Sequence, residues 1–94
     1  MRKLVDDHLQ EIKGIVALHH GLSVAIFGSV ARGDELPGSD IDFLVELSPS
    51  ARPIEILSMG VELEDALGVS VDVGTPESLP LEVRERVMAE AIPL

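Results

Sequence analysis

The stretch "IFGSVARGDELPGSDIDFLVE", from Ile26 to Glu46, is the most informative part of the chain. Its second half, residues 40–47, reads as a strand in which polar and apolar residues begin by alternating. Asp40 and Asp42 lie two residues apart there, about 6.5–7 Å at the backbone, so their side chains point to the same side of the strand. The stretch therefore raises the question of why a small protein places paired carboxylates in an otherwise apolar strand.

Paired carboxylates have two plausible explanations here. Two carboxylates at this distance repel each other unless a positive charge lies between them. Two metal ions roughly 3.5–4 Å apart would fit the pair and hold a reacting phosphate, and hard cations such as Mg²⁺ prefer such oxygen ligands. The ordinary alternative is that Asp40 caps a turn while Asp42 faces solvent on an edge strand. Taken alone, the pair leaves both interpretations open.

The residues just upstream predict a site for an anion. Gly28 and Ser29 follow a short apolar run and precede an expected helix start, where backbone N–H groups point at phosphate oxygens. Gly28 has no side chain to obstruct a ligand, and Arg32 can act as a charge clamp on a phosphate. The alternatives are an ordinary turn and a surface ion pair of Arg32 with Asp34 or Glu35. An anion-binding turn beside a cation-binding pair suits a nucleoside triphosphate with its metal ions.

A third carboxylate is expected, because a two-metal site usually needs one to hold the second ion and the nucleophile. The segment "VSVDV", residues 69–73, offers Asp72. Its alternation places Ser70 and Asp72 on one face of a strand and three valines on the other. An unpaired charge in an apolar strand is costly, which favours a role for Asp72. The alternative is the exposed face of an edge strand.

The remaining pattern predicts a single domain, residues 1–94, in which helices pack on a small mixed β-sheet, an α/β (α+β) class. Helices are expected at residues 2–20, 53–67 and 80–91, with a short one from Ser29, and strands at 22–27, 40–47 and 69–73. The last helix should turn Leu81, Val83, Val87 and Met88 inward. Helix 53–67 is apolar on more than one side, so either the sheet covers it or a partner does. The terminal "IPL" is either a core plug or a docking tail.

The amino-acid composition limits the classes of partner that this protein can bind. Seven basic and seventeen acidic residues give a net charge of −10, which argues against nucleic acid and against acidic membranes. The same charge favours divalent cations or a basic protein partner. No cysteine is present, which excludes disulfides and thiolate zinc sites. No apolar run approaches the ~18 residues of a membrane span, so a cytoplasmic protein is expected.

A family resemblance rests on Gly28-Ser29, Arg32-Gly33, the run from Ser39 to Asp42, and Asp72, with "VDVGTPESLP" and "AEAIPL" also alike. This pattern resembles the nucleotidyltransferase superfamily that includes DNA polymerase beta. Within it, the chain is similar to the minimal nucleotidyltransferases (MNT), the antitoxin halves of HEPN/MNT toxin–antitoxin pairs. The resemblance implies a polymerase-beta-like fold over most of the chain.

The resemblance also implies roles for residues. Asp40, Asp42 and Asp72 would bind the metals, with Asp72 also helping to activate the attacking hydroxyl. Gly28 and Ser29 would hold the triphosphate of ATP. Arg32 would contact a phosphate, and Ser39 would organise the loop. The expected cofactor is Mg²⁺, as two ions, with Mn²⁺ as the alternative.

The implied reaction is transfer of AMP from ATP to a hydroxyl. No tyrosine is present, and the few residues after Asp72 leave room for one helix rather than an acceptor-binding domain, so the acceptor should come from outside. In the resembled family it is a tyrosine of the HEPN toxin, a ribonuclease. The alternative is an antitoxin that acts by stoichiometric binding alone. A homo-oligomer is left open.

Overall fold

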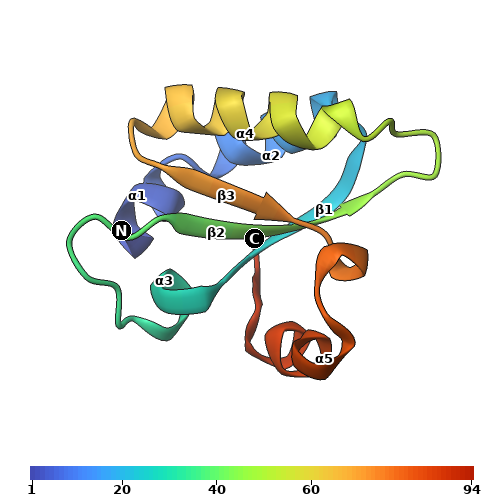
Figure 1. Ribbon diagram of the computed structural model, residues 1–94. Coiled ribbons are helices and arrows are strands. Elements are labelled where there is room, and N and C mark those ends of the chain that lie inside the picture. The colour runs from blue at the N-terminus through green and yellow to red at the C-terminus, as the bar shows by residue number, and fades with distance from the viewer.

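The computed structural model describes all residues, Met1–Leu94, as a four-stranded sheet with helices on both faces (Figure 1). The strands are β1 (Gly21–Phe27), β2 (Ile41–Leu47), β3 (Val71–Gly74) and β4 (Ile92–Pro93), in the spatial order β3-β2-β1-β4. β1 runs antiparallel to β2 and β4, whereas β2 and β3 are parallel. The sheet is therefore mixed, and the predicted fold class is confirmed.

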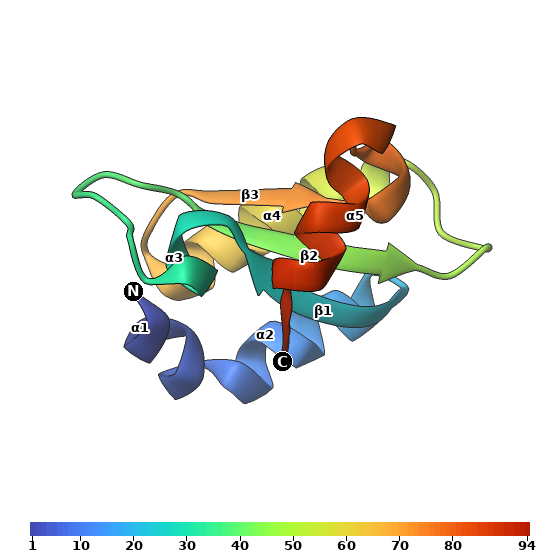
Figure 2. The same cartoon turned by 90° about the horizontal axis from the view of Figure 1, so that it is seen from below.

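The helices are α1 (Arg2–Asp7), α2 (Leu9–Leu18), α3 (Gly28–Arg32), α4 (Ile54–Leu67) and α5 (Leu81–Glu90), with a 3-10 turn at Pro76–Ser78. α2 and α4 cover one face of the sheet, while α3 and α5 lie on the other (Figures 1 and 2). None of these helices combines the length and the apolar character needed to cross a membrane.

The expected helix over residues 2–20 is divided at His8. The His8 ring places Nδ1 2.9 Å from the carbonyl oxygen of Leu4, the group that would accept the His8 N–H in a continuous helix. A side chain that enters the backbone ladder in this way interrupts a helix. The other predicted helices and strands agree with the structure to within two residues at each end.

The core lies between the sheet and the helices α2 and α4. Ile41, Phe43 and Val45 of β2 are fully buried in it, together with Ile12, Met59 and other apolar residues of the helices. Successive residues of a strand point to opposite faces. Burial of these alternate β2 residues therefore turns Asp42 to the opposite face, on the side of α3 and α5.

The inward orientation predicted for the last helix is wrong in part. No residue of α5 is fully buried, and Leu81 and Met88 are 76% and 51% exposed. α5 lies on the face of the sheet that carries Asp42, outside the main core, so it has less apolar surface to cover it. The terminal residues are a plug rather than a tail, because β4 pairs with β1 and the Leu94 N–H donates to the Val24 carbonyl at 3.0 Å.

α4 keeps one uncovered apolar stripe. Met59, Leu63 and Leu67 are buried, but Ile54, Leu57 and Val61 are 49%, 67% and 59% exposed. These three residues follow the i, i+3, i+7 spacing of one helix face. The sheet and neighbouring helices therefore do not cover the whole helix.

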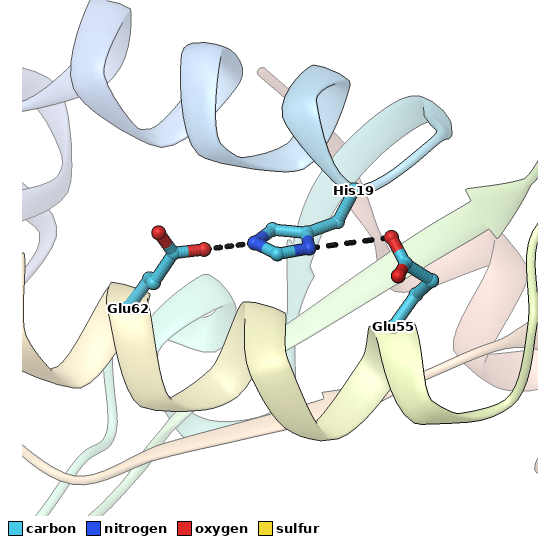
Figure 3. Close-up of polar contacts among 3 residues, drawn as sticks. All are labelled: His19, Glu55 and Glu62. Carbon is cyan, nitrogen blue, oxygen red and sulfur yellow. Dashed lines mark hydrogen bonds and ion pairs between the residues drawn. The ribbon is translucent and has the colours of Figure 1, made fainter.

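His19 joins α2 to α4, as Figure 3 shows. Its Nδ1 lies 3.3 Å from Oε2 of Glu55, in the first turn of α4, and its Nε2 contacts Glu62, in the second half of α4. Both ring nitrogens are thus occupied by carboxylates. His19 therefore has a structural role in the contact between the two helices.

Candidate active site

Three residues form a row across the sheet on the side of α3 and α5. Phe27 of β1 is the register partner of Asp42 in β2, and Asp42 is in turn the partner of Asp72 in β3. Partners in neighbouring strands project from the same face of a sheet. The two aspartates, separated by 29 residues in the chain, are therefore adjacent side chains.

The electrostatics of Asp42 show which charges surround it. Its pKa is raised above the ordinary value, first by partial burial, and then by the negative charges of Asp72 and Asp40. The positive charge of Arg32 acts in the opposite direction. The structure thus brings all three predicted carboxylates and the predicted arginine into one electrostatic cluster, in which Asp40 and Asp72 are exposed.

Gly28 adjoins this cluster at the junction of β1 and α3. Its φ of +72° lies in the left-handed region, which side-chain-bearing residues rarely adopt. A Cβ added at this position would collide with the Asp42 carboxylate. The bend at Gly28 and Ser29 therefore lies directly beside the aspartates, as the order of the motif predicts.

The loop between α3 and β2 is closed by Ser39. Its Oγ accepts the Leu36 N–H at 3.0 Å, and its own N–H donates to the Leu36 carbonyl at 3.0 Å. Asp34 anchors the other end of the loop by donating its N–H to the Ser29 carbonyl at 3.0 Å. These bonds close the loop just before β2 begins at Ile41, so they fix where Asp40 precedes the strand.

Arg32 is exposed and held by two carboxylates. Its Nε donates to Oδ2 of Asp34 at 3.2 Å, and its Nη1 lies 3.6 Å from Oε2 of Glu90. Glu35, the other partner considered from the sequence, instead binds the N-terminal amine of Met1 at 2.9 Å. Exposed pairs of this kind are weak, so Arg32 can exchange its partners for a phosphate.

The carboxylates of Asp40, Asp42 and Asp72 are ligands that suit hard divalent cations. No group of three or more His, Cys, Asp or Glu side chains has the geometry of a metal site made by protein alone. Mg²⁺ is usually held by one or two carboxylates together with substrate phosphates and water. Burial, and after it the negative charges of Asp72 and Asp40, raise the pKa of Asp42, and bound cations would neutralise those negative charges. The residues present therefore fit such ions when a triphosphate completes the coordination.

A cleft between α3 and α5 borders the same site, and sequence patterns gave no indication of it. Its volume is about 350 Å³, and its lining residues are Phe27, Gly28, Arg32, Arg86, Val87 and Glu90. Arg86 received no role from the sequence because it belongs to no motif. Only the packing of α5 against the face that carries Asp42 places it near Gly28.

Comparison with known proteins fits this geometry. The nucleotidyltransferase domain family matches residues 7–94, and the chain belongs to that family. A Methanocaldococcus jannaschii relative, provisionally named protein adenylyltransferase MJ0435, is 38% identical over 78 residues, which cover 82% of this chain and 84% of the relative. Protein adenylyltransferase MntA of Thermococcus cleftensis is 28% identical over 92 residues, which cover 89% and 93% of the two chains.

Solved structures agree. One described provisionally as a minimal nucleotidyltransferase has a TM-score of 0.88 and 34% identity, covering 98% of this chain and 94% of its own. A toxin–antitoxin structure with AMP-PNP has a TM-score of 0.75 at 21% identity, covering 89% and 69%. A complex of tri-AMPylated Shewanella oneidensis HEPN toxin with MNT antitoxin has a TM-score of 0.67 at 18% identity, covering 99% and 71%, and like the previous one it shows the shared fold. The predicted family and enzyme class are confirmed.

Proposed function

We propose that this nucleotidyltransferase is a metal-dependent protein adenylyltransferase that transfers AMP from ATP to a tyrosine hydroxyl of a HEPN toxin, and so acts as its antitoxin. The observation that carries the proposal is the in-register pairing of Asp42 with Asp72, with Gly28 directly against the Asp42 carboxylate. The names of the relatives support adenylylation of a protein. The similar fold seen with AMP-PNP supports ATP as the donor.

In the proposed reaction the tyrosine oxygen forms a bond to the α-phosphorus of ATP, and the bond from that phosphorus to pyrophosphate breaks. Asp40, Asp42 and Asp72 would hold two Mg²⁺ ions, with Mn²⁺ as the alternative. Bound cations of this kind stabilise the entering and leaving oxygens and lower the pKa of the nucleophile. Asp72, exposed at the edge of the row, would accept the hydroxyl proton.

The remaining motif residues position the donor. Gly28 leaves space for the triphosphate beside Asp42, and Ser29 adds a hydroxyl at the same bend. Arg32 would exchange its carboxylate partners for a phosphate oxygen. Ser39 holds the loop that brings Asp40 into line. Positioning and charge stabilisation of this kind supply most of the catalysis in phosphoryl chemistry.

A protein partner supplies the acceptor in this proposal. The described residues include no tyrosine, and the exposed α4 stripe of Ile54, Leu57 and Val61 offers an apolar surface for docking. The net charge of −10 suits a basic protein rather than nucleic acid. A HEPN toxin in the same cytoplasm, a ribonuclease with a basic RNA-binding surface, has the required character.

The test is incubation with ATP labelled at the α-phosphate and the candidate toxin. Label should pass to the toxin, and it should be lost with a chelator, with a toxin lacking its acceptor tyrosine, or with Asp42→Asn. Asp65→Asn is the matched control, because Asp65 is an exposed carboxylate of α4, on the opposite face of the sheet from the row. Transfer that survives in Asp42→Asn at the level of the Asp65→Asn control would refute the catalytic site.

The alternative function, neutralisation by stoichiometric binding, gives a different result in cells. Asp42→Ala should fail to protect against the toxin at the normal dose if catalysis is required. Full protection by Asp42→Ala, with no label on the toxin, would instead favour an antitoxin whose acidic surface blocks the partner.

A further inference from the structure

The cleft between α3 and α5 has an unusual charge for this protein. Only seven of the 94 residues are basic, yet two of them, Arg32 and Arg86, line this one cleft. Figure 2 shows α3 and α5 on the same face of the sheet. With Glu90 as the single acidic lining residue, the cleft carries a net positive charge on an acidic protein, which points to an anionic ligand.

The two arginines differ in whether their side chains have partners within the protein. Arg32 is paired with Asp34 and Glu90. Arg86 makes no ion pair within 4.0 Å and no side-chain hydrogen bond within the chain. All of its N–H donors are therefore free for a ligand, and a guanidinium matches the oxygens of a phosphate group with two parallel bonds.

The cleft also connects with the aspartate row. Gly28 is common to both, because it lines the cleft and its Cα faces the Asp42 carboxylate. A nucleotide whose α-phosphate lies at the aspartates thus has space for its remaining phosphates past Gly28, toward α5. Phe27 lines the cleft and is also the register partner of Asp42.

We propose that Arg86 binds the terminal phosphates of the nucleotide in the cleft between α3 and α5, and so helps to position the pyrophosphate leaving group. The ligand class is the polyphosphate tail of a nucleoside triphosphate. This inference rests on the proposed function, since it assigns a further residue to the same nucleotide. Glu90 competes with the tail for Arg32 and so weakens binding.

The experiment is calorimetric titration of the full chain with AMP-PNP and with AMP, each in the presence of Mg²⁺. Arg86→Gln should weaken AMP-PNP binding about tenfold, as expected for one lost charge-assisted contact. AMP, which lacks the terminal phosphates, should bind Arg86→Gln and the wild type equally. Glu90→Gln should instead tighten AMP-PNP binding, by roughly two- to threefold, because it frees Arg32.

Arg52→Gln is the control for net charge, because Arg52 lies in the exposed loop that follows the opposite end of β2, and it should leave both affinities unchanged. Denaturant unfolding should show that Arg86→Gln folds like the wild type. Equal AMP-PNP binding by Arg86→Gln and wild type, or equal loss of AMP and AMP-PNP binding, would overturn the assignment while leaving the proposed function intact. If Arg86→Gln loses affinity for AMP-PNP but not for AMP, while the wild type transfers no AMP to the toxin, the result would support the role of Arg86 and count against the proposed function.

Discussion

The Asp42 carboxylate fills the space that a side chain at position 28 would need, so Gly28 and Asp42 form one structural unit. The backbone at Gly28 also has a φ of +72°. Two separate requirements, the left-handed conformation and the close approach, therefore fix glycine at the junction of β1 and α3. The bend and the carboxylate row cannot change independently of each other.

The first prediction is that Gly28→Ala abolishes AMP transfer and lowers the free energy of unfolding by more than the strain of a left-handed residue, about 1–3 kcal/mol. The new Cβ must displace the Asp42 carboxylate in addition to adopting the strained φ. Urea denaturation and labelled-AMP transfer measure the two effects.

Gly68→Ala is the matched control for that substitution. Gly68 has the same φ of +72°, but no atom lies within 4 Å of an added Cβ, and it ends α4 away from the site. It should carry the cost of the strained backbone alone and retain transfer. If both variants remained equally active, the close approach of Gly28 to Asp42 would have no catalytic importance.

The sequence alone predicted much of this site because strand alternation is a local property. It placed Asp40 and Asp42 on one side of a strand and identified the Gly28 bend before them. It could not show that β3 pairs with β2 in parallel with Asp72 opposite Asp42, since such register depends on contacts between distant segments. The roles of these residues stay predictions, although the structure brings them together.

The errors have equally specific causes. Apolar spacing across residues 2–20 is continuous, but the helix is divided at His8, whose ring contacts the Leu4 carbonyl and whose backbone departs from helical geometry. Apolar residues in the last helix suggested burial, but their cover depends on where α5 docks on the sheet. Arg86 lies outside every motif, so only its position in space identifies it.

The second prediction concerns the pH dependence of stability. The pKa of Asp42 is raised in the folded state, mainly by burial and then by Asp72 and Asp40. The folded state therefore holds this proton more tightly than the unfolded state, and stability falls as pH rises from the ordinary value of 3.8 through the folded pKa. Above that pKa the charged Asp42 carboxylate lowers the free energy of unfolding by its full amount.

Asp42→Asn removes this penalty, because asparagine carries no charge at any pH. In chelator-containing buffer the variant should be more stable than the wild type near neutral pH, by less than about 1 kcal/mol because the half-buried charge is partly screened. The difference should disappear as pH falls below 3.8, where Asp42 is protonated in both states. Chemical denaturation of both proteins across this pH range measures it, and an Asn variant that is less stable at neutral pH would contradict the prediction.

The third prediction is that His19→Ala destabilises the fold by about 1–3 kcal/mol, the cost of leaving partly buried polar groups without a partner. His19 lies between Glu55 and Glu62, and its loss leaves two carboxylates of α4 without their contact to α2 (Figure 3). Thermal unfolding of the variant should show the loss. His19→Ala combined with Glu55→Gln and Glu62→Gln should recover part of it, and a failure to recover any would indicate that packing of the ring, not its polar contacts, holds the helices together.

The fourth prediction concerns His20, the only non-glycine residue with a positive φ, at 65°. The helix expected over residues 2–20 ends at this point, and the left-handed conformation of His20 costs a residue with a side chain about 1–2 kcal/mol. His20→Gly should raise the free energy of unfolding by about 0.5–1 kcal/mol, the strain removed less the added entropy of the unfolded chain. Its backbone bonds to Ala17 and Ser48 remain available.

His8→Gly is the matched control, because His8 has an ordinary φ of −113° and a ring that contacts Leu4, so the same substitution should destabilise there. Equilibrium denaturation of the two variants should give changes of opposite sign, and a loss of stability in both would show that the conformation at His20 is not strained.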